Sequence, residues 1–283
     1  MKTLIILLLV LIIIGLIFHE KLYYLTQRYI LNKSIKLPPK PNVRNLLLIS
    51  NSREYELGRE SYFKHCQHNI KKFLEPLNVK SILLIPYGGA GPVTRDADKY
   101  TQIIKEEVCT DLDVTLTSIH TFVNEHDQQA AILNAECIFV SGGNAFKLLD
   151  ELYKKNLVKP LQKAVLRGIP YIGVSSGVVV ANPSLHTSRS MPIIKPVTYR
   201  GLDLIPFYIN VHYYQALGNR LNQYLLRNPK EKILAITEGV VIHVVGNKGE
   251  VVGFGKVELL ENRSGDFIRR RLPIGSNISF LLN

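Results

Sequence analysis

Five residues from Gly173 to Gly177 read GVSSG, the residue types that nucleophilic catalysis needs. A Gly-x-Ser-x-Gly run between a strand and a helix presents its central serine on a sharp turn, and the glycines relieve crowding around it. The run overlaps the end of PYIGV, an apolar stretch typical of a buried strand. The pattern predicts Ser175 as a nucleophile and the backbone N–H of Ser176 as a donor to an oxyanion.

A second glycine-containing loop, Ser141 to Asn144, follows another apolar run. Gly142 and Gly143 let backbone N–H groups point into a cleft, and the start of the next helix adds positive potential, so this loop is a candidate oxyanion site. An ordinary tight turn, with Asn144 capping the helix, is equally consistent with the sequence.

His212 follows a further apolar run, FYINV, and is the candidate base for Ser175. A lone histidine is more often structural than catalytic. The assignment of His212 therefore depends on its being brought next to the serine.

Short hydrophobic runs alternate with helical patterns around these loops. The runs fall at 46–49, 81–85, 114–119, 137–140 and 170–174, with helical patterns at about 60–74, up to 108 and at 145–154. Uniformly apolar runs of this kind are typical of a parallel sheet covered on both faces. From Ile233 onward, hairpins with turns at 246–249 and 262–265 take over. The prediction is an open, mostly parallel α/β sandwich with a β-rich C-terminal part and catalytic loops at the carboxyl ends of its strands.

Several motifs in this order resemble peptidase E, the alpha-aspartyl dipeptidases. They are LLISNS at 47–52, IPY at 85–87, GGNAFKLL at 142–149, YIGVSSG at 171–177, MPI at 191–193, INVH at 209–212 and EG at 238–239. The resemblance implies a three-layer α/β/α fold of the class I glutamine-amidotransferase-like type and a serine peptidase that acts on dipeptides. It places the nucleophile on Ser175, the base on His212 and the oxyanion donors on Gly142, Gly143 and Ser176, and it implies no metal or other cofactor.

The chain departs from the family pattern at two places. The family carries an acidic residue just before its Met-Pro-Ile motif to orient the histidine, but Ser190 stands there. A neutral hydroxyl cannot stabilise an imidazolium as a carboxylate does. Activity is therefore expected to be reduced, unless a neighbouring carboxylate substitutes. Glu238 is the family-matched candidate, although a turn residue at the end of a strand is the simpler interpretation of that glutamate.

The second departure concerns the residues that would bind substrate. After the histidine the family has an arginine-rich, acidic stretch, in which Leu217 and Gly218 replace an expected arginine and an expected acid. Arg220 remains and is predicted, with Asn144, to bind the substrate. A single arginine pairs less firmly with a carboxylate than a bidentate clamp, so strict aspartyl specificity is not expected.

The N-terminus reads as a membrane segment. Leu4 to Phe18 holds fifteen residues without a polar side chain, and no small-x-small cleavage site follows. Residues 1–22 are predicted to be a single-pass transmembrane anchor or an uncleaved signal, 23–43 a basic, proline-containing stalk, and 44–283 the peptidase-like domain. Five Lys and Arg residues lie between Phe18 and Pro41, which favours a cytoplasmic-facing domain.

The composition of the chain narrows the class of protein and the partners that it can have. The chain has 283 residues, 46% of them hydrophobic, and a net charge of +12, as expected of a folded protein. Three distant cysteines make a disulfide framework and a zinc site improbable. The first 40 residues carry +5 of this charge (six Lys and Arg against one Glu), and the other +7 is spread thinly over the remaining 243 residues. Nucleic acid is therefore not an expected partner.

Three functions stay open, and a homodimer is possible in each. The preferred one is a membrane-anchored serine dipeptidase acting on small peptides. The alternative is a catalytically impaired homologue that binds a peptide or amino acid at the membrane. The third is a binder of anionic membrane or nucleic acid through the basic stalk.

Overall fold

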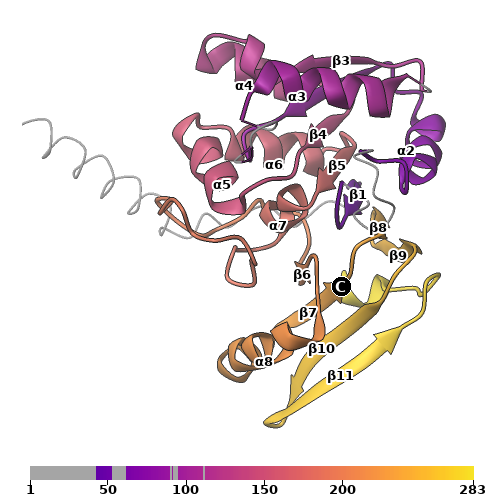
Figure 1. The fold of residues 1–283 in the computed structure, drawn as a ribbon, viewed down its shortest axis with the longest axis vertical. Coiled ribbons are helices and arrows are strands. Elements are labelled where there is room, and N and C mark those ends of the chain that lie inside the picture. The colour runs from indigo at the N-terminus through magenta and orange to yellow at the C-terminus, as the bar shows by residue number, and fades with distance from the viewer. Residues whose placement is uncertain (1–42, 53–61, 90, 92–94, 111) are drawn as a thin grey trace, which may run out of the picture. The chain divides into compact units, whose positions relative to one another are not determined.

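The computed structural model describes residues 43–52, 62–89, 91, 95–110 and 112–283. Within these ranges the strands form two sheets, one of seven strands and one of four (Figure 1). The larger sheet has the order β3 (Thr115–Ser118), β2 (Ser81–Ile85), β4 (Ile138–Val140), β5 (Tyr171–Val174), β1 (Asn45–Ile49), β8 (Val240–Val245) and β9 (Lys248–Gly253). The smaller sheet has the order β11 (Asp266–Leu272), β10 (Val257–Arg263), β7 (Lys232–Ile236) and β6 (Tyr208–Asn210).

Parallel pairing dominates the larger sheet. Neighbouring strands are parallel along the series β3, β2, β4, β5 and β1. The two remaining pairings, of β8 with β1 and of β9 with β8, are antiparallel. β1 and β5 are neighbours in register, with Ile49 opposite Val174. The segments that follow them therefore leave the same edge of the sheet side by side, and these segments carry Ser50 and Ser175. The predicted mixed α/β fold with a large sheet is confirmed.

Helices connect the strands, and several begin at a polar residue whose side chain accepts backbone N–H groups. Asp96, Asn124 and Asn144 do this for α3, α4 and α5. The α-helices in the described part of the chain are α2 (Gln67–Leu74), α3 (Ala97–Ile104), α4 (Glu125–Leu133), α5 (Ala145–Lys154), α6 (Val158–Leu166), α7 (Ser176–Ala181) and α8 (Gly218–Arg227). A π-helix over Lys105–Cys109 continues α3, and 3-10 turns occupy Glu75–Leu77, Ile119–Thr121, Gln215–Leu217 and Ser279–Leu281.

Both faces of the larger sheet are covered by helices, because successive side chains along each strand point to opposite sides. Leu46 and Leu48 of β1 pack in one core with α5, α6 and α7. Leu47 and Ile49 pack in a second core with α2 and α3. The result is a helix, sheet and helix layering. The finer assignment to the class I glutamine-amidotransferase-like fold stays a prediction.

The smaller sheet has its own hydrophobic core, which the sequence analysis did not separate from the rest. α8 lies along this sheet (Figure 1). Its Leu221 and Leu225 share a core with Ile233 and Leu260 of the sheet. In the β-rich C-terminal part, the predicted hairpin turns join β8 to β9 and β10 to β11. This part contributes strands to both sheets, since β8 and β9 extend the larger one.

Two sequence-based expectations need comment. The helix predicted over about 60–74 begins only at Gln67, because Phe63 is buried with a φ of 63° and a turn runs from it to Cys66. The predicted anchor over 1–22 and nearly all of the predicted stalk over 23–43 lie outside the described residues. Among the helices that the structure does describe, none is long and apolar enough to span a membrane.

Candidate active site

Ser175 occupies a strained turn between β5 and α7. Its φ of 50° and ψ of −103° are unusual for a residue with a side chain. A Cβ at Gly177 would lie 2.3 Å from the carbonyl oxygen of Val140, and one at Gly173 would lie 2.7 Å from the ring of Tyr171. Both flanking glycines are thus required by close backbone packing, as the Gly-x-Ser-x-Gly pattern implies.

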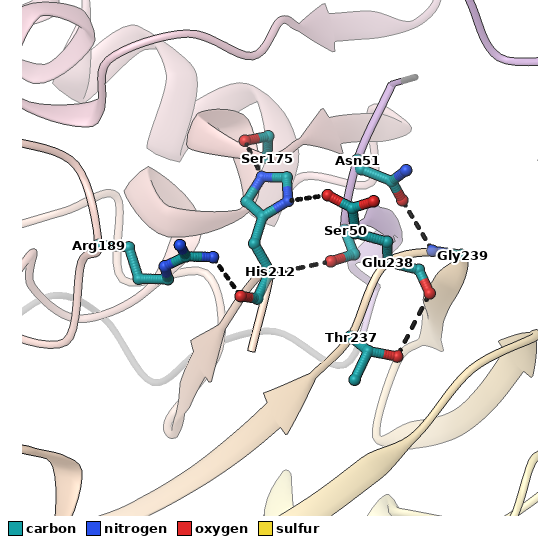
Figure 2. Close-up of polar contacts among 8 residues, drawn as sticks. All are labelled: Ser50, Asn51, Ser175, Arg189, His212, Thr237, Glu238 and Gly239. Atoms are coloured by element: carbon teal, nitrogen blue, oxygen red, sulfur yellow. Dashed lines mark hydrogen bonds and ion pairs between the residues drawn. The ribbon is translucent and has the colours of Figure 1, made fainter. Parts of the chain in front are cut away.

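His212 lies beside this serine. It follows β6, and its Nε2 is 2.8 Å from the hydroxyl oxygen of Ser175 (Figure 2). The histidine backbone has a φ of 52°, in the left-handed region, which costs a residue with a side chain about 1–3 kcal/mol. Its N–H donates to the hydroxyl of Ser50 at 3.3 Å, and its carbonyl accepts a hydrogen bond from the guanidinium of Arg189.

Glu238 completes a hydrogen-bonded series. Its Oε1 lies 3.2 Å from Nδ1 of His212, on the side of the ring away from Ser175 (Figure 2). The glutamate stands in the turn between β7 and β8, where Gly239 donates its N–H to the side-chain oxygen of Asn51 at 2.8 Å. Glu238 is therefore both a turn residue and a partner of the histidine. Its side chain is 44% exposed, against 27% for His212.

Ser190 lies away from the imidazole in this arrangement. Its hydroxyl accepts the N–H of Ala145 at 3.1 Å, at the beginning of α5. Among the contacts of the described residues, none joins Ser190 to His212. The position at which the resemblance expects an orienting acid thus serves as part of a helix cap, and the carboxylate next to the imidazole is that of Glu238.

Asn144 has the role that the simpler interpretation gave it. Its side-chain oxygen accepts the N–H groups of Phe146 and Lys147 at 3.0 and 3.1 Å, and its amide donates to the carbonyl of Met191 at 2.7 Å. Both ends of the side chain are therefore used within the protein. Its predicted role in binding substrate stays a prediction.

The candidate oxyanion loop lies against the serine. A Cβ at Gly142 would be 3.3 Å from the Cβ of Ser175. Gly143 has a φ of 129°, a Cβ there would be 2.0 Å from the carbonyl oxygen of Gly88, and its carbonyl accepts the hydroxyl of Ser176 at 2.6 Å. Among the hydrogen bonds of the described residues, none is donated by the backbone N–H of Gly142, Gly143 or Ser176. Their role as oxyanion donors stays a prediction.

The segment after His212 differs from the predicted substrate clamp. Arg220 is exposed and donates to the carbonyl of Ser188 at 2.7 Å. A Cβ at Gly218 would lie 2.3 Å from a terminal nitrogen of Arg269, which pairs with Glu258 at 3.4 Å. The guanidinium of Arg269 therefore fills the space that an acidic side chain at position 218 would need.

Residues that the sequence analysis missed surround the histidine. Ser50 and Asn51 are buried, and Arg189 is exposed. The only sequence signal for the first two is that they end the apolar run of β1, since the pairing of β1 with β5 that brings them to the site is not visible in the sequence. Within the part of the chain that the structure describes, no group of three or more His, Cys, Asp or Glu side chains could hold a metal ion.

A serine hydroxyl, an imidazole and a carboxylate in series, at the ends of strands in an α/β fold, form the arrangement that serine hydrolases use. A model of Peptidase family S51 matches residues 46–252, and the chain belongs to that family. The family indicates a serine peptidase or dipeptidase, and the resemblance to peptidase E is confirmed.

Similar proteins carry related names. A Drosophila melanogaster protein named "Probable alpha-aspartyl dipeptidase" is 33% identical over 252 residues, which are 85% of this chain and 98% of that protein. A "Peptidase E" of Shewanella denitrificans is 34% identical over 249 residues, covering 84% and 99% of the two chains. The crystal structure of a peptidase from an acI-B1 actinobacterium has a TM-score of 0.65 at 18% identity and covers 84% and 97%. That structure supports the fold alone.

Proposed function

We propose that the protein is a serine-type dipeptidase that hydrolyses small peptides, with Ser175 as nucleophile and His212 as base. The observation that carries the proposal is the 2.8 Å contact between the serine hydroxyl and Nε2 of the histidine. A nucleophile and a base within hydrogen-bond reach, with the base held by a third group, are the signature of an activated serine.

In the first half of the reaction, the Ser175 oxygen attacks the peptide carbonyl carbon while Nε2 of His212 takes the hydroxyl proton. The carbonyl oxygen becomes an oxyanion, which the N–H groups of Gly142 or Gly143 and of Ser176 stabilise. His212 then gives the proton to the leaving nitrogen, and the C–N bond breaks. An ester on Ser175 remains.

In the second half, His212 takes a proton from water, whose oxygen attacks the ester carbonyl. The tetrahedral intermediate collapses, the proton returns to the serine oxygen, and the product acid leaves. Nδ1–H of His212 donates to Glu238 throughout. The carboxylate keeps the imidazole in the required tautomer and stabilises the imidazolium in both halves.

The class of substrate follows from a relative's name and from the residues after His212. The name of the Drosophila relative points to alpha-aspartyl dipeptides. Arg220 keeps a guanidinium near the site, but it is bonded to a backbone carbonyl, and Leu217 offers no charge. We therefore infer a preference for small peptides with relaxed selection for an aspartyl first residue.

A peptide panel tests the proposal. The full chain would be incubated with dipeptides whose first residue is Asp, Asn, Glu or Leu, and the products followed by mass spectrometry. Cleavage between the two residues is expected, and the ratio of kcat/KM for Asp to that for Leu measures how far selection is relaxed. A folded protein that cleaves none of them would contradict the proposal and favour the peptide-binding alternative.

The acid limb of the rate profile is a second test. Burial lowers the pKa of His212 below its usual value, the charge of Arg189 lowers it further, and Glu238 acts in the opposite direction. The base works in its neutral form. We therefore expect kcat/KM to rise with pH to a plateau, with a midpoint below about 6.5. Initial rates between about pH 4 and pH 8 would measure it, and a midpoint above that value would be inconsistent with a buried His212 base.

The impaired-homologue alternative rested on the neutral hydroxyl of Ser190 and on the changed arginine stretch after His212. Since a carboxylate from Glu238 lies at Nδ1 of His212, we do not favour it.

We further infer that residues 1–22 anchor the protein in a membrane with the domain on the cytoplasmic side. The full chain should stay with membranes washed at alkaline pH, whereas a Leu8→Arg, Ile12→Arg variant should be released. Release of both would contradict the anchor.

A further inference from the structure

Four residues, Ser188 to Met191, join the two sides of the candidate active site, and we call this segment the brace. On one side it holds the beginning of α5, just after the oxyanion loop. The hydroxyl of Ser190 accepts the N–H of Ala145 at 3.1 Å, and the carbonyl of Met191 accepts the amide of Asn144 at 2.7 Å. The brace is thus fixed to the segment that carries Gly142 and Gly143.

On its other side the brace holds the histidine. Arg189 donates from its guanidinium to the backbone carbonyl of His212, and the same guanidinium lies over the ring of Tyr214, 4.8 Å from its centre. The side chain of Arg189 thus contacts both His212 and Tyr214, which lies two residues further along the chain. Arg220 of α8 donates to the carbonyl of Ser188 at 2.7 Å and holds the beginning of the brace in place.

The base needs such support because its backbone is in a conformation that a residue with a side chain rarely adopts. His212 has a φ of 52°, and such conformations persist only where the surroundings determine them. Its N–H is held by Ser50 and its imidazole by Glu238. Arg189 holds the carbonyl, which is the third polar group of the residue (Figure 2).

We propose that Arg189 is a positioning residue for the base, which it fixes through the carbonyl of His212 and the ring of Tyr214. The inference rests on the proposed function. Among the described residues, the charged groups that act on the imidazole are Glu238, which is hydrogen-bonded to it, and Arg189, which is bonded to the backbone carbonyl of the same residue. Replacing Arg189 therefore removes a positive charge as well as a hydrogen bond. It should both misplace the base and make its protonation easier.

The main test is Arg189→Met, which keeps an unbranched, flexible apolar side chain and removes the charge and the donors of the guanidinium. We expect kcat to fall about 10- to 100-fold, because an error of about 1 Å in placement can cost about two orders of magnitude. KM should change less than about threefold, since binding is not the role assigned. The acid limb of kcat/KM should move to higher pH, because a cation that disfavours protonation of the imidazole has gone.

Arg189→Lys and Arg271→Met are the comparison variants. Lysine keeps the charge, so its acid limb should stay near that of the wild type. It lacks the planar guanidinium that reaches both the carbonyl of His212 and the ring of Tyr214, so kcat should still fall. Arg271 is an exposed arginine of β11, and its replacement removes the same charge elsewhere. An equal loss in Arg271→Met, or an Arg189→Met variant with wild-type kcat and acid limb, would overturn the proposal. Should the methionine variant fail to fold, a wild-type kcat in Arg189→Lys would overturn it.

An NMR titration separates this inference from the proposed function. The pH at which the imidazole of His212 becomes protonated can be followed in labelled protein whether or not any peptide is cleaved. A midpoint that rises in Arg189→Met and holds in Arg189→Lys supports the role of Arg189, even if the peptide panel fails. If the wild type cleaves peptides but the midpoint is unchanged in Arg189→Met, the positioning role of Arg189 is excluded while the proposed function stands.

Discussion

Replacing Ser175 by alanine is expected to lower kcat by about 10⁴- to 10⁶-fold, the range seen when an activated nucleophile is removed. The hydroxyl oxygen at 2.8 Å from Nε2 of His212 is the atom that would form the ester. Water is then the only remaining attacking group, and the residual rate comes from the oxyanion donors and substrate binding alone. Single-turnover cleavage of the best dipeptide in the panel would measure the loss.

Ser176→Ala is the matched control for this prediction. The two serines are adjacent, but the hydroxyl of Ser176 donates to the carbonyl of Gly143 and is buried. Its N–H, the atom assigned to the oxyanion, survives the substitution. We expect a loss of about tenfold or less, from loosening of the glycine loop. A larger loss for Ser176→Ala than for Ser175→Ala would reassign the nucleophile.

The second large effect is expected for Glu238→Gln, with kcat lowered about 10²- to 10⁴-fold. The amide has nearly the shape of the carboxylate but cannot stabilise an imidazolium. Because the glutamate side chain is 44% exposed, solvent supplies part of what is lost, and the lower part of the range is expected. Glu238 raises the pKa of His212, so the acid limb should also move to lower pH. A kcat within about threefold of wild type would rule out the glutamate as the orienting group.

Adding Ser190→Asp to Glu238→Gln asks whether the acid can be supplied from the position expected by family resemblance. We expect no recovery of kcat, because the side chain at 190 caps α5 through the N–H of Ala145. Recovery would mean that the segment 188–191 can move its side chain to the imidazole. It would also show that the lost acid, and not Glu238, is what the family pattern requires.

Much of the fold could be predicted because its signals are local. The helix over 145–154 was expected at the bounds that α5 has, since an asparagine cap and a helical pattern lie together in the sequence. The strand before Ser175 and the glycines around it could be recognised for the same reason. These features depend on neighbours in the chain.

The partners of His212 could not be assigned with the same certainty. Glu238 lies 26 residues from the histidine, and Ser50 lies 162 residues away. Only the pairing of strands brings them together. Arg189 carried no signal either, because an exposed arginine beside a serine has no pattern of its own. The left-handed backbone of His212 is likewise set by tertiary contacts.

The nucleophile and the base follow strands of different sheets. Ser175 follows β5 of the seven-stranded sheet and His212 follows β6 of the four-stranded one, while Glu238 lies in the turn that connects β7 of the smaller sheet to β8 of the larger. The rate of turnover therefore depends on how the two sheets are aligned. A displacement of about 1 Å between the two sheets would lower the rate of hydrolysis about 100-fold. The hydrogen bonds within each sheet, and therefore the far-UV circular dichroism spectrum of the protein, would not change. Increasing concentrations of denaturant should accordingly abolish activity before either hydrophobic core unfolds.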